Sequence, residues 1–361
     1  MVIFKPGDLI VKCYPYAHCV TGGEKNTRCH YCLKRMPFMK RCSKCRTARY
    51  CSSKCQAKDW KYVHQLECKY FKEDSETLSH LFQGDTIRLV LRILLMNKKY
   101  PHKAIEEVET IYGKKSFSTL INHSDELFNE PNDRYEQIHN MALFFEMLGI
   151  EFEMDSYREI YSKVSTNSYT ISNYFLNNIG TSVYIAASVF GHSCLSNTCH
   201  VFNGITMEIR ATKEIDTQNE AITLSYVNPL YPRQKRLNVL AGRYYISCKC
   251  PRCVSPNEQE DADLIKSVEK FHDFMHKNDL QSSLEAGLEF LALFTPHFPY
   301  PTAIVTYVYD RLVHVCKNLD DEKALYFEKE WSKYLHITHG RDPQQFVQEY
   351  QDPPLIYNSD P

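Results

Sequence analysis

Residues 29–68 read CHYCLKRMPFMKRCSKCRTARYCSSKCQAKDWKYVHQLEC, and this stretch decides the fold. Seven cysteines and one histidine fall in it as four close pairs, with two or three residues between the members of each pair. The pairs are Cys29 with Cys32, Cys42 with Cys45, Cys51 with Cys55, and His64 with Cys68. Two side chains this close in sequence reach one ion from a single turn, and two pairs complete the tetrahedral coordination of zinc. The stretch therefore predicts two zinc ions.

We assign the four pairs to the two ions by alternation. On this interpretation the first ion is bound by Cys29, Cys32, Cys51 and Cys55. The second ion is bound by Cys42, Cys45, His64 and Cys68. Interleaved zinc sites brace a segment that is too short to build a hydrophobic core of its own. Sequential pairing is the open alternative, whereas a disulfide framework is disfavoured by the histidine in register with the last cysteine.

The composition of the whole chain is that of a globular protein. Of its 361 residues, 43% are hydrophobic and 13% aromatic, which is enough for two or three domains. The 43 lysines and arginines nearly balance the 44 aspartates and glutamates, so overall charge does not drive binding to nucleic acid or to a membrane surface. No apolar run approaches the roughly 20 residues of a membrane span, and Met1–Lys12 lacks the residue order of a secretory signal. We expect a soluble, intracellular protein without membrane contact.

The basic residues gather around the cysteine pairs. Between Lys25 and Lys72 there are fourteen lysines and arginines but only two acids, Asp59 and Glu67. A local excess of positive charge predicts contact with an acidic peptide or with DNA. The alternative is a solvated surface whose cations offset zinc-bound thiolates. Within this region, the residues from Ser53 to Gln56 are typical of a capping box that opens a short helix through Trp60.

A third cysteine cluster lies far downstream. Cys248, Cys250 and Cys253 offer three thiolates, so a closed structural zinc site needs a fourth ligand from elsewhere. Cys194 is the best candidate, because it sits in a polar turn that directly follows an apolar run. Eleven cysteines and His64 then make twelve ligands, which suffice for three zinc ions. The remaining four of the fifteen cysteines are expected to be buried free thiols: Cys13, Cys19, Cys199 and Cys316.

These motifs resemble a known family. The spacing of residues 29–68 resembles a MYND zinc finger, and its place near the start of a longer chain resembles the SMYD protein-lysine methyltransferases, in which the finger interrupts a SET domain. The other motifs follow in the order of that family: residues 167–171 (NSYTI), 191–194 (GHSC) with Asn197, 222–226 (ITLSY), and the cysteines after residue 247. The resemblance covers nearly the whole chain.

The fold class that this resemblance implies is α+β. We expect a SET-domain β-fold of short strands, split by the finger and by a helical insertion, with a post-SET zinc site and a C-terminal TPR-like helical domain. The expected segments are the start of the SET domain at 1–28, the MYND finger at 29–68, the helical insertion at 69–160, the SET core at 161–240, the post-SET motif at 241–256 and the TPR-like helices at 257–361.

Apolar spacing supports the two helical parts independently. Ile87, Val90, Leu91 and Leu94 predict an amphipathic helix over residues 84–97. Four further stripes of helical period, within residues 265–275, 280–291, 305–315 and 324–334, predict four C-terminal helices with short connections.

The resemblance implies methylation of lysine in histone or non-histone proteins, with S-adenosylmethionine as methyl donor. Tyr169 and Tyr244 would line the lysine channel, and Tyr226 would be the catalytic residue that orients the amine. Asn167, Gly191 and His192 would contact the cofactor. A lone tyrosine or histidine is more often a packing residue, so these roles depend on the family register.

Three departures from the family pattern predict weakened cofactor binding. Gly191 stands where the family has asparagine, Ile246 replaces an aromatic residue, and residues 5–8 (KPGD) match the segment that follows a Gly-x-Gly element absent from this chain. Each lost hydrogen bond costs on the order of 1 to 3 kcal/mol. The alternative is therefore a weak or inactive scaffold that binds partner proteins in transcriptional regulation. We expect a monomer in the nucleus and cytoplasm, with a lysine-bearing protein as substrate.

Overall fold

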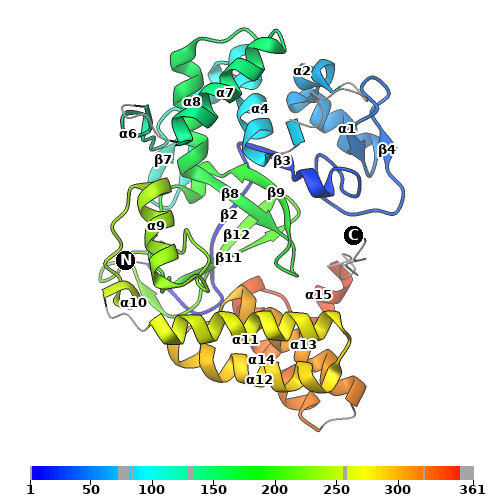
Figure 1. Ribbon diagram of the computed structural model, residues 1–361, viewed down its shortest axis with the longest axis vertical. Coiled ribbons are helices and arrows are strands. Elements are labelled where there is room, and N and C mark those ends of the chain that lie inside the picture. The colour runs from blue at the N-terminus through cyan, green and yellow to red at the C-terminus, as the bar shows by residue number, and fades with distance from the viewer. Residues whose placement is uncertain are drawn as a thin grey trace.

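The computed structural model describes residues 2–71, 81–82, 84–128, 133–254, 258–319 and 322–349. Figure 1 shows short strands in the middle of the molecule, with helices and a small irregular module above them and four long helices below. This mixture of helices and short strands, with a zinc-binding module and a helical C-terminal region, confirms the predicted α+β class.

The strands form small sheets that join distant parts of the sequence. In the first sheet, β2 (Leu9–Cys13) pairs with β12 (Thr206–Ala211), which pairs with β11 (Thr198–Asn203), all antiparallel. In the second, β3 (Ala17–Val20) and β8 (Ser168–Ser172) flank β9 (Asn178–Val183), again antiparallel. The residues before the cysteine-rich stretch therefore complete sheets whose other strands lie more than 140 residues later.

Two shorter pairings complete the strand region. In the first, β1 (Ile3–Phe4) pairs antiparallel with β13 (Ile215–Asp216). In the second, β10 (Gly191–His192) pairs with β14 (Thr223–Leu224) in parallel. This last pair brings the 191–194 turn beside the segment that leads to Tyr226.

The cysteine-rich module contains little regular structure. It has the hairpin of β4 (Lys40–Arg41) and β5 (Arg49–Tyr50), the helix α1 (Ser53–Asp59), a π-helical turn at Trp60–His64 and the short α2 (Gln65–Glu67). The helix cap differs from the prediction by one residue. Ser52 has the extended backbone of an N-cap and its side chain accepts the Cys55 N–H, whereas Ser53 is already helical. The prediction took the serine that lies three residues before Gln56. Because Ser52 and Ser53 are adjacent, the sequence does not decide which of them caps the helix.

The helical insertion begins with α4 (Asp85–Lys99) and α5 (His102–Ile105). A hairpin of β6 (Val108–Thr110) and β7 (Gly113–Lys115) follows, and then come the three helices α6 (Ser124–Phe128), α7 (Asp133–Met147) and α8 (Met154–Asn167).

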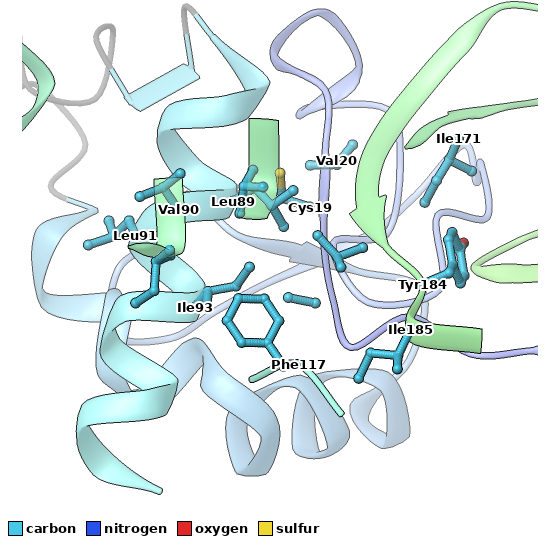
Figure 2. Packing of buried hydrophobic residues seen from close by; sticks show 14 of the residues in the cluster. Cys19, Val20, Leu89, Val90, Leu91, Ile93, Phe117, Ile171, Tyr184 and Ile185 are labelled. Carbon is cyan, nitrogen blue, oxygen red and sulfur yellow. The ribbon is translucent and has the colours of Figure 1, made fainter. Parts of the chain in front are cut away.

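The first of these helices forms where it was predicted and has the predicted apolar period, but its polar face is buried as well. Residues 88–94 are buried without interruption, including Arg88 and Arg92, so α4 is enclosed on all sides. Its apolar residues pack against β3, and Figure 2 shows Leu89 beside Cys19 and Phe117 between Ile93 and Ile185. One hydrophobic core therefore joins the insertion, the cysteine-rich module and the sheets.

The C-terminal region builds a second core from α11 (Glu258–His276), α12 (Leu280–His297), α13 (Ala303–Leu319), α14 (Ala324–His339) and α15 (Pro343–Glu349). The four predicted helices are all present in this region. At Gly340 the backbone is left-handed (φ +62°), which ends α14. Next to it, Arg341 lies 3.6 Å from Glu208 on β12, and this ion pair joins the helices to the strands. Among the described residues no helix is long and apolar enough to cross a membrane.

Candidate metal centres and tyrosine site

The eight metal-ligating side chains of the cysteine-rich module gather in two groups. In each group the four candidate ligand atoms lie within 4.8 Å of one another. The groups are Cys29, Cys32, Cys51 and Cys55, and Cys42, Cys45, His64 and Cys68. The structure thus brings together alternate pairs rather than sequential ones.

Sulfur–sulfur distances test whether these groups fit zinc. Zinc with sulfur ligands at about 2.3 Å in a tetrahedron holds neighbouring sulfurs about 3.8 Å apart, whereas a disulfide needs about 2.05 Å. The Sγ atoms of Cys32 and Cys51 are 3.6 Å apart, and those of Cys42 and Cys68 are 3.9 Å apart. None of the fifteen cysteines, all within the described residues, forms a disulfide. Both groups therefore fit zinc and do not fit a disulfide framework.

His64 has distinct partners for its two ring nitrogens. Its Nε2 is 3.6 Å from Cys45 Sγ and points into the second group, and its Nδ1 is 3.3 Å from Glu67 Oε1. A carboxylate that accepts the N–H of a zinc-bound histidine fixes the tautomer and the orientation of the ring. Glu67 is therefore the residue that aims His64 at the ion.

The third group forms at the end of the strand region. Cys194 and the three later cysteines, Cys248, Cys250 and Cys253, place their sulfurs within 4.8 Å of one another, with 3.6 Å between Cys194 and Cys253. Cys253 lies in α10 (Pro251–Val254), which follows the long helix α9 (Arg233–Tyr244). A fourth ligand for the downstream cluster is thus present at the position chosen from the sequence. The described part of the structure contains three zinc-binding cysteine clusters.

Three tyrosines come together beside this third group. The rings of Tyr226 and Tyr244 have centroids 5.0 Å apart. The Tyr226 hydroxyl donates to the Phe190 carbonyl, and the Tyr244 hydroxyl donates to the Tyr226 carbonyl at 3.4 Å. Tyr169, on β8, donates to the Ala187 carbonyl at 3.3 Å. Each of the three hydroxyls thus donates to a backbone carbonyl group.

Burial keeps these phenols neutral. Desolvation, with the nearby Tyr244 as a smaller cause, raises the pKa of Tyr226 to about 12. The pKa of Tyr169 is raised well above its ordinary value, mainly by burial and then by the other two phenols. The pKa of Tyr244 is also raised by burial. Near neutral pH all three side chains are hydrogen-bond donors and acceptors rather than bases.

His192 connects the tyrosines to the third metal group. Its Nδ1 accepts the backbone N–H of Tyr226 at 3.0 Å, so the ring hydrogen is on Nε2, which lies 3.3 Å from Cys194 Sγ. Burial lowers the pKa of His192 to about 4, which favours this neutral form. A thiolate on a metal ion would therefore hold the imidazole, and the imidazole in turn holds the backbone of Tyr226.

The other two predicted cofactor contacts have different surroundings. Gly191 is exposed, and a Cβ atom built on it would meet nothing within 4 Å. Asn167 ends α8, where its amide donates to the carbonyls of Ile121 and Lys163, both at 2.8 Å. Both amide hydrogens of Asn167 are therefore used within the protein, which leaves only its oxygen for another partner.

Comparison with known proteins agrees with this geometry. Residues 29–68 match the family described as "MYND finger". N-lysine methyltransferase SMYD2 of Bos taurus is 27% identical over 340 residues, which cover 93% of this chain and 73% of that protein. N-lysine methyltransferase SMYD2-A of Danio rerio is 31% identical over 259 residues (71% and 57%), and histone-lysine N-methyltransferase SMYD3 of Homo sapiens is 30% identical over 274 residues (74% and 60%). The chain belongs to the SMYD family.

In this SMYD-family chain the sequence did not indicate how α9 is held. Arg243 donates from Nε to the Ser165 carbonyl at 2.9 Å and from Nη2 to the Ser168 carbonyl at 3.0 Å. These bonds fix the end of α9, which carries Tyr244, to the start of β8, which carries Tyr169. Next to Arg243 and Tyr244, Tyr245 packs on His123 with ring centroids 4.5 Å apart. Tyr245 ends α9 with a left-handed backbone. Glycine is the usual sequence signal for such a helix end, and because tyrosine stands here instead, the sequence did not indicate where α9 ends.

Proposed function

We propose that this chain methylates the side-chain amine of lysine in a protein, with S-adenosylmethionine as the methyl donor. The observation that carries the proposal is the convergence of Tyr169, Tyr226 and Tyr244 beside the third zinc-binding group, in a chain related to named N-lysine methyltransferases. S-adenosylmethionine supplies an activated methyl group on a sulfonium. In the transfer the sulfur–carbon bond breaks with its electron pair left on sulfur, and the lysine nitrogen forms the new carbon–nitrogen bond.

The tyrosines prepare the lysine for this step. An ammonium ion must lose a proton before its nitrogen can attack, and transfer from water into a site lined by aromatic rings lowers the pKa of lysine. Neutral phenols and the carbonyls of Ala187 and Phe190 then offer hydrogen-bonding groups around the amine. We assign orientation of the amine to the Tyr226 hydroxyl and the walls of the channel to Tyr169 and Tyr244.

We assign the methyl donor to the turn that contains Gly191 and His192. The exposed backbone of Gly191, with open space where a Cβ would be, lets a ligand approach closely. We place the cofactor against this turn, in contact with Gly191, His192 and the oxygen of Asn167. A zinc ion bound to Cys194 would fix the position of the 191–194 turn relative to Tyr226. The methyl donor and the lysine amine would then meet in a single orientation.

The substrate and setting follow from the same proposal. We infer a histone or another lysine-bearing protein as substrate, a monomeric enzyme, and a place in the nucleus and cytoplasm. We further propose that the chain divides at the segment bounds predicted from its sequence and that the basic MYND finger contacts an acidic peptide or DNA.

Two measurements on the purified chain test the activity. The first is binding of S-adenosylmethionine by calorimetry. The second is transfer of a radiolabelled methyl group to lysine in a mixture of histones and other proteins. We expect both to be positive. Failure to bind the cofactor would reject the proposal and favour the scaffold alternative, whereas binding without transfer would show that the substrate mixture lacks the target.

A further inference from the structure

The MYND finger and α4 meet at a cluster of fully buried charges. Arg92 of α4 contacts two acids of the finger, with Nη2 2.6 Å from Asp59 Oδ1 and Nη1 2.7 Å from Glu67 Oε1. Arg88, one turn earlier, has its Nη2 3.1 Å from the same Glu67 oxygen. All four side chains are 0% exposed in these ion pairs. Asp59 and Glu67 are the only acids of the basic stretch between Lys25 and Lys72.

The cluster is balanced in charge and closed to solvent. Two carboxylates face two guanidiniums, and the Tyr50 hydroxyl donates to Asp59 Oδ2 at 2.8 Å. An unpaired charge at such depth costs several kcal/mol, so neither half of the cluster is stable in this position without the other. Asp59, His64 and Glu67 also lie close enough together to resemble a metal site, but the guanidiniums already occupy the two carboxylates as cations.

Glu67 takes part in two structures at once. Its Oε1 binds both guanidiniums and also lies 3.3 Å from Nδ1 of His64, whose Nε2 faces Cys45 in the second zinc group. The first zinc group consists of four cysteines and has no such histidine. His30 does contact Arg88, at 3.4 Å from Nη2, but His30 is not a member of either group.

We propose that zinc binding by the Cys42, Cys45, His64 and Cys68 group and docking of the finger on α4 are one coupled equilibrium, with Glu67 as the positioning residue. The docked guanidiniums hold Glu67 where it aims His64 at the ion, and the bound ion holds His64 where it keeps Glu67 on the guanidiniums. Coupling of this kind is reciprocal: zinc strengthens docking by the factor by which docking strengthens zinc binding.

The consequence reaches beyond the finger, because α4 also packs on β3, β9 and α8. Figure 2 shows Leu89 of α4 beside Cys19, in the sheet to which the Tyr169 strand belongs. Loss of the second zinc therefore loosens the helix that braces this sheet, whereas loss of the first zinc stays within the finger. This inference does not depend on the proposed enzymatic activity.

The test measures release of zinc from the purified full chain into a chromogenic chelator in excess. Glu67→Gln keeps the size of the side chain and removes its charge. Since loss of an outer carboxylate partner typically weakens a metal site 10–100-fold, we expect one of the three zincs to leave about 10- to 100-fold faster. The matched control is Glu24→Gln, which removes a carboxylate that lies just before the finger in sequence and 3.3 Å from Arg28. We expect the control to release all three zincs at the rate of the unmodified chain.

Hydrogen exchange over Asp85–Lys99 provides the second reading. Cys68→Ser, which removes a ligand of the second group, should increase exchange in α4, and Cys55→Ser, which removes a ligand of the first, should leave α4 protected. If Glu67→Gln does not fold, the double variant Glu67→Gln with Arg88→Met removes both charges of one pair and tests the same coupling. Unchanged zinc release in the folded variant, or equal exposure of α4 in both cysteine variants, would overturn the proposal.

Discussion

Tyr226→Phe separates the chemical role of the Tyr226 hydroxyl from its structural role. The hydroxyl donates to the carbonyl of Phe190, a residue that is 1% exposed, so its removal leaves a buried acceptor without its partner. That loss should lower the free energy of unfolding by about 1 to 3 kcal/mol. If the hydroxyl also orients the amine, removal of one oriented polar group costs on the order of 10² to 10³ in rate, which corresponds to about 2.7 to 4 kcal/mol in the barrier.

A matched variant makes the comparison strict. The Tyr157 hydroxyl in α8 donates to the carbonyl of Ile138, which is also 1% exposed, at 2.7 Å. Tyr157→Phe therefore removes an equivalent hydrogen bond away from the tyrosine site. Urea unfolding gives the stability of each variant, and single-turnover methyl transfer with saturating S-adenosylmethionine gives the rate. We expect similar losses of stability in both variants, unchanged cofactor binding in both, and a loss of rate in Tyr226→Phe alone.

Two results would refute this reasoning. If Tyr226→Phe transfers methyl as fast as the unmodified chain, the hydroxyl only packs against Phe190 and the assigned register is wrong. If both variants lose the same fraction of their rate, the effect on Tyr226 is one of stability and not of chemistry.

Three further predictions concern metal content, the cofactor turn and pH. Elemental analysis should find three zinc ions per chain, and a result of two or fewer would reject the zinc site assigned to Cys194. Gly191→Asn should strengthen cofactor binding by about 10-fold in calorimetry, because one added hydrogen bond to the cofactor is worth on the order of 1 kcal/mol and nothing within 4 Å of the new Cβ opposes it; no change would mean a remodelled pocket. Burial, aided by Arg341 and Arg210, lowers the pKa of His339 from 6.5 to about 3. The unfolded chain then binds a proton that the folded chain excludes, so stability falls as pH drops below 6.5, by about 3 kcal/mol at pH 4.5. In urea unfolding, His339→Gln should lose about 3 kcal/mol less stability between neutral pH and pH 4.5 than the unmodified chain, and an unchanged loss would contradict the assignment.

Local constraints made part of this molecule predictable from its sequence. Tetrahedral coordination favours ligands that lie close together in sequence, so spacing alone indicated eleven of the twelve side chains that the structure groups, whereas Cys194 was chosen from its place in a polar turn. Each C-terminal helix packs one face against a shared hydrophobic core. Its apolar residues therefore recur at helical spacing, which made these helices predictable. Sheet pairing is different. Cys13 faces Met207 and Ala17 faces Val183, and no local pattern specifies partners so far apart. These pairings were accessible only through the resemblance to the SMYD family.

The helix α4 shows that the finger is attached to the rest of the chain by buried charges. Its apolar residues gave the correct period, but Arg88 and Arg92 made its other face look solvated. Arginine is expected to be exposed unless a partner neutralises it, and the partners, Asp59 and Glu67, belong to another segment. Zinc binding makes the finger rigid although it is too small to build a hydrophobic core of its own. Zinc binding alone does not attach the finger to the rest of the chain. The attachment requires a negative charge that neutralises the buried arginines of α4. Glu67, which lies between the zinc ligands His64 and Cys68 in sequence, supplies that charge.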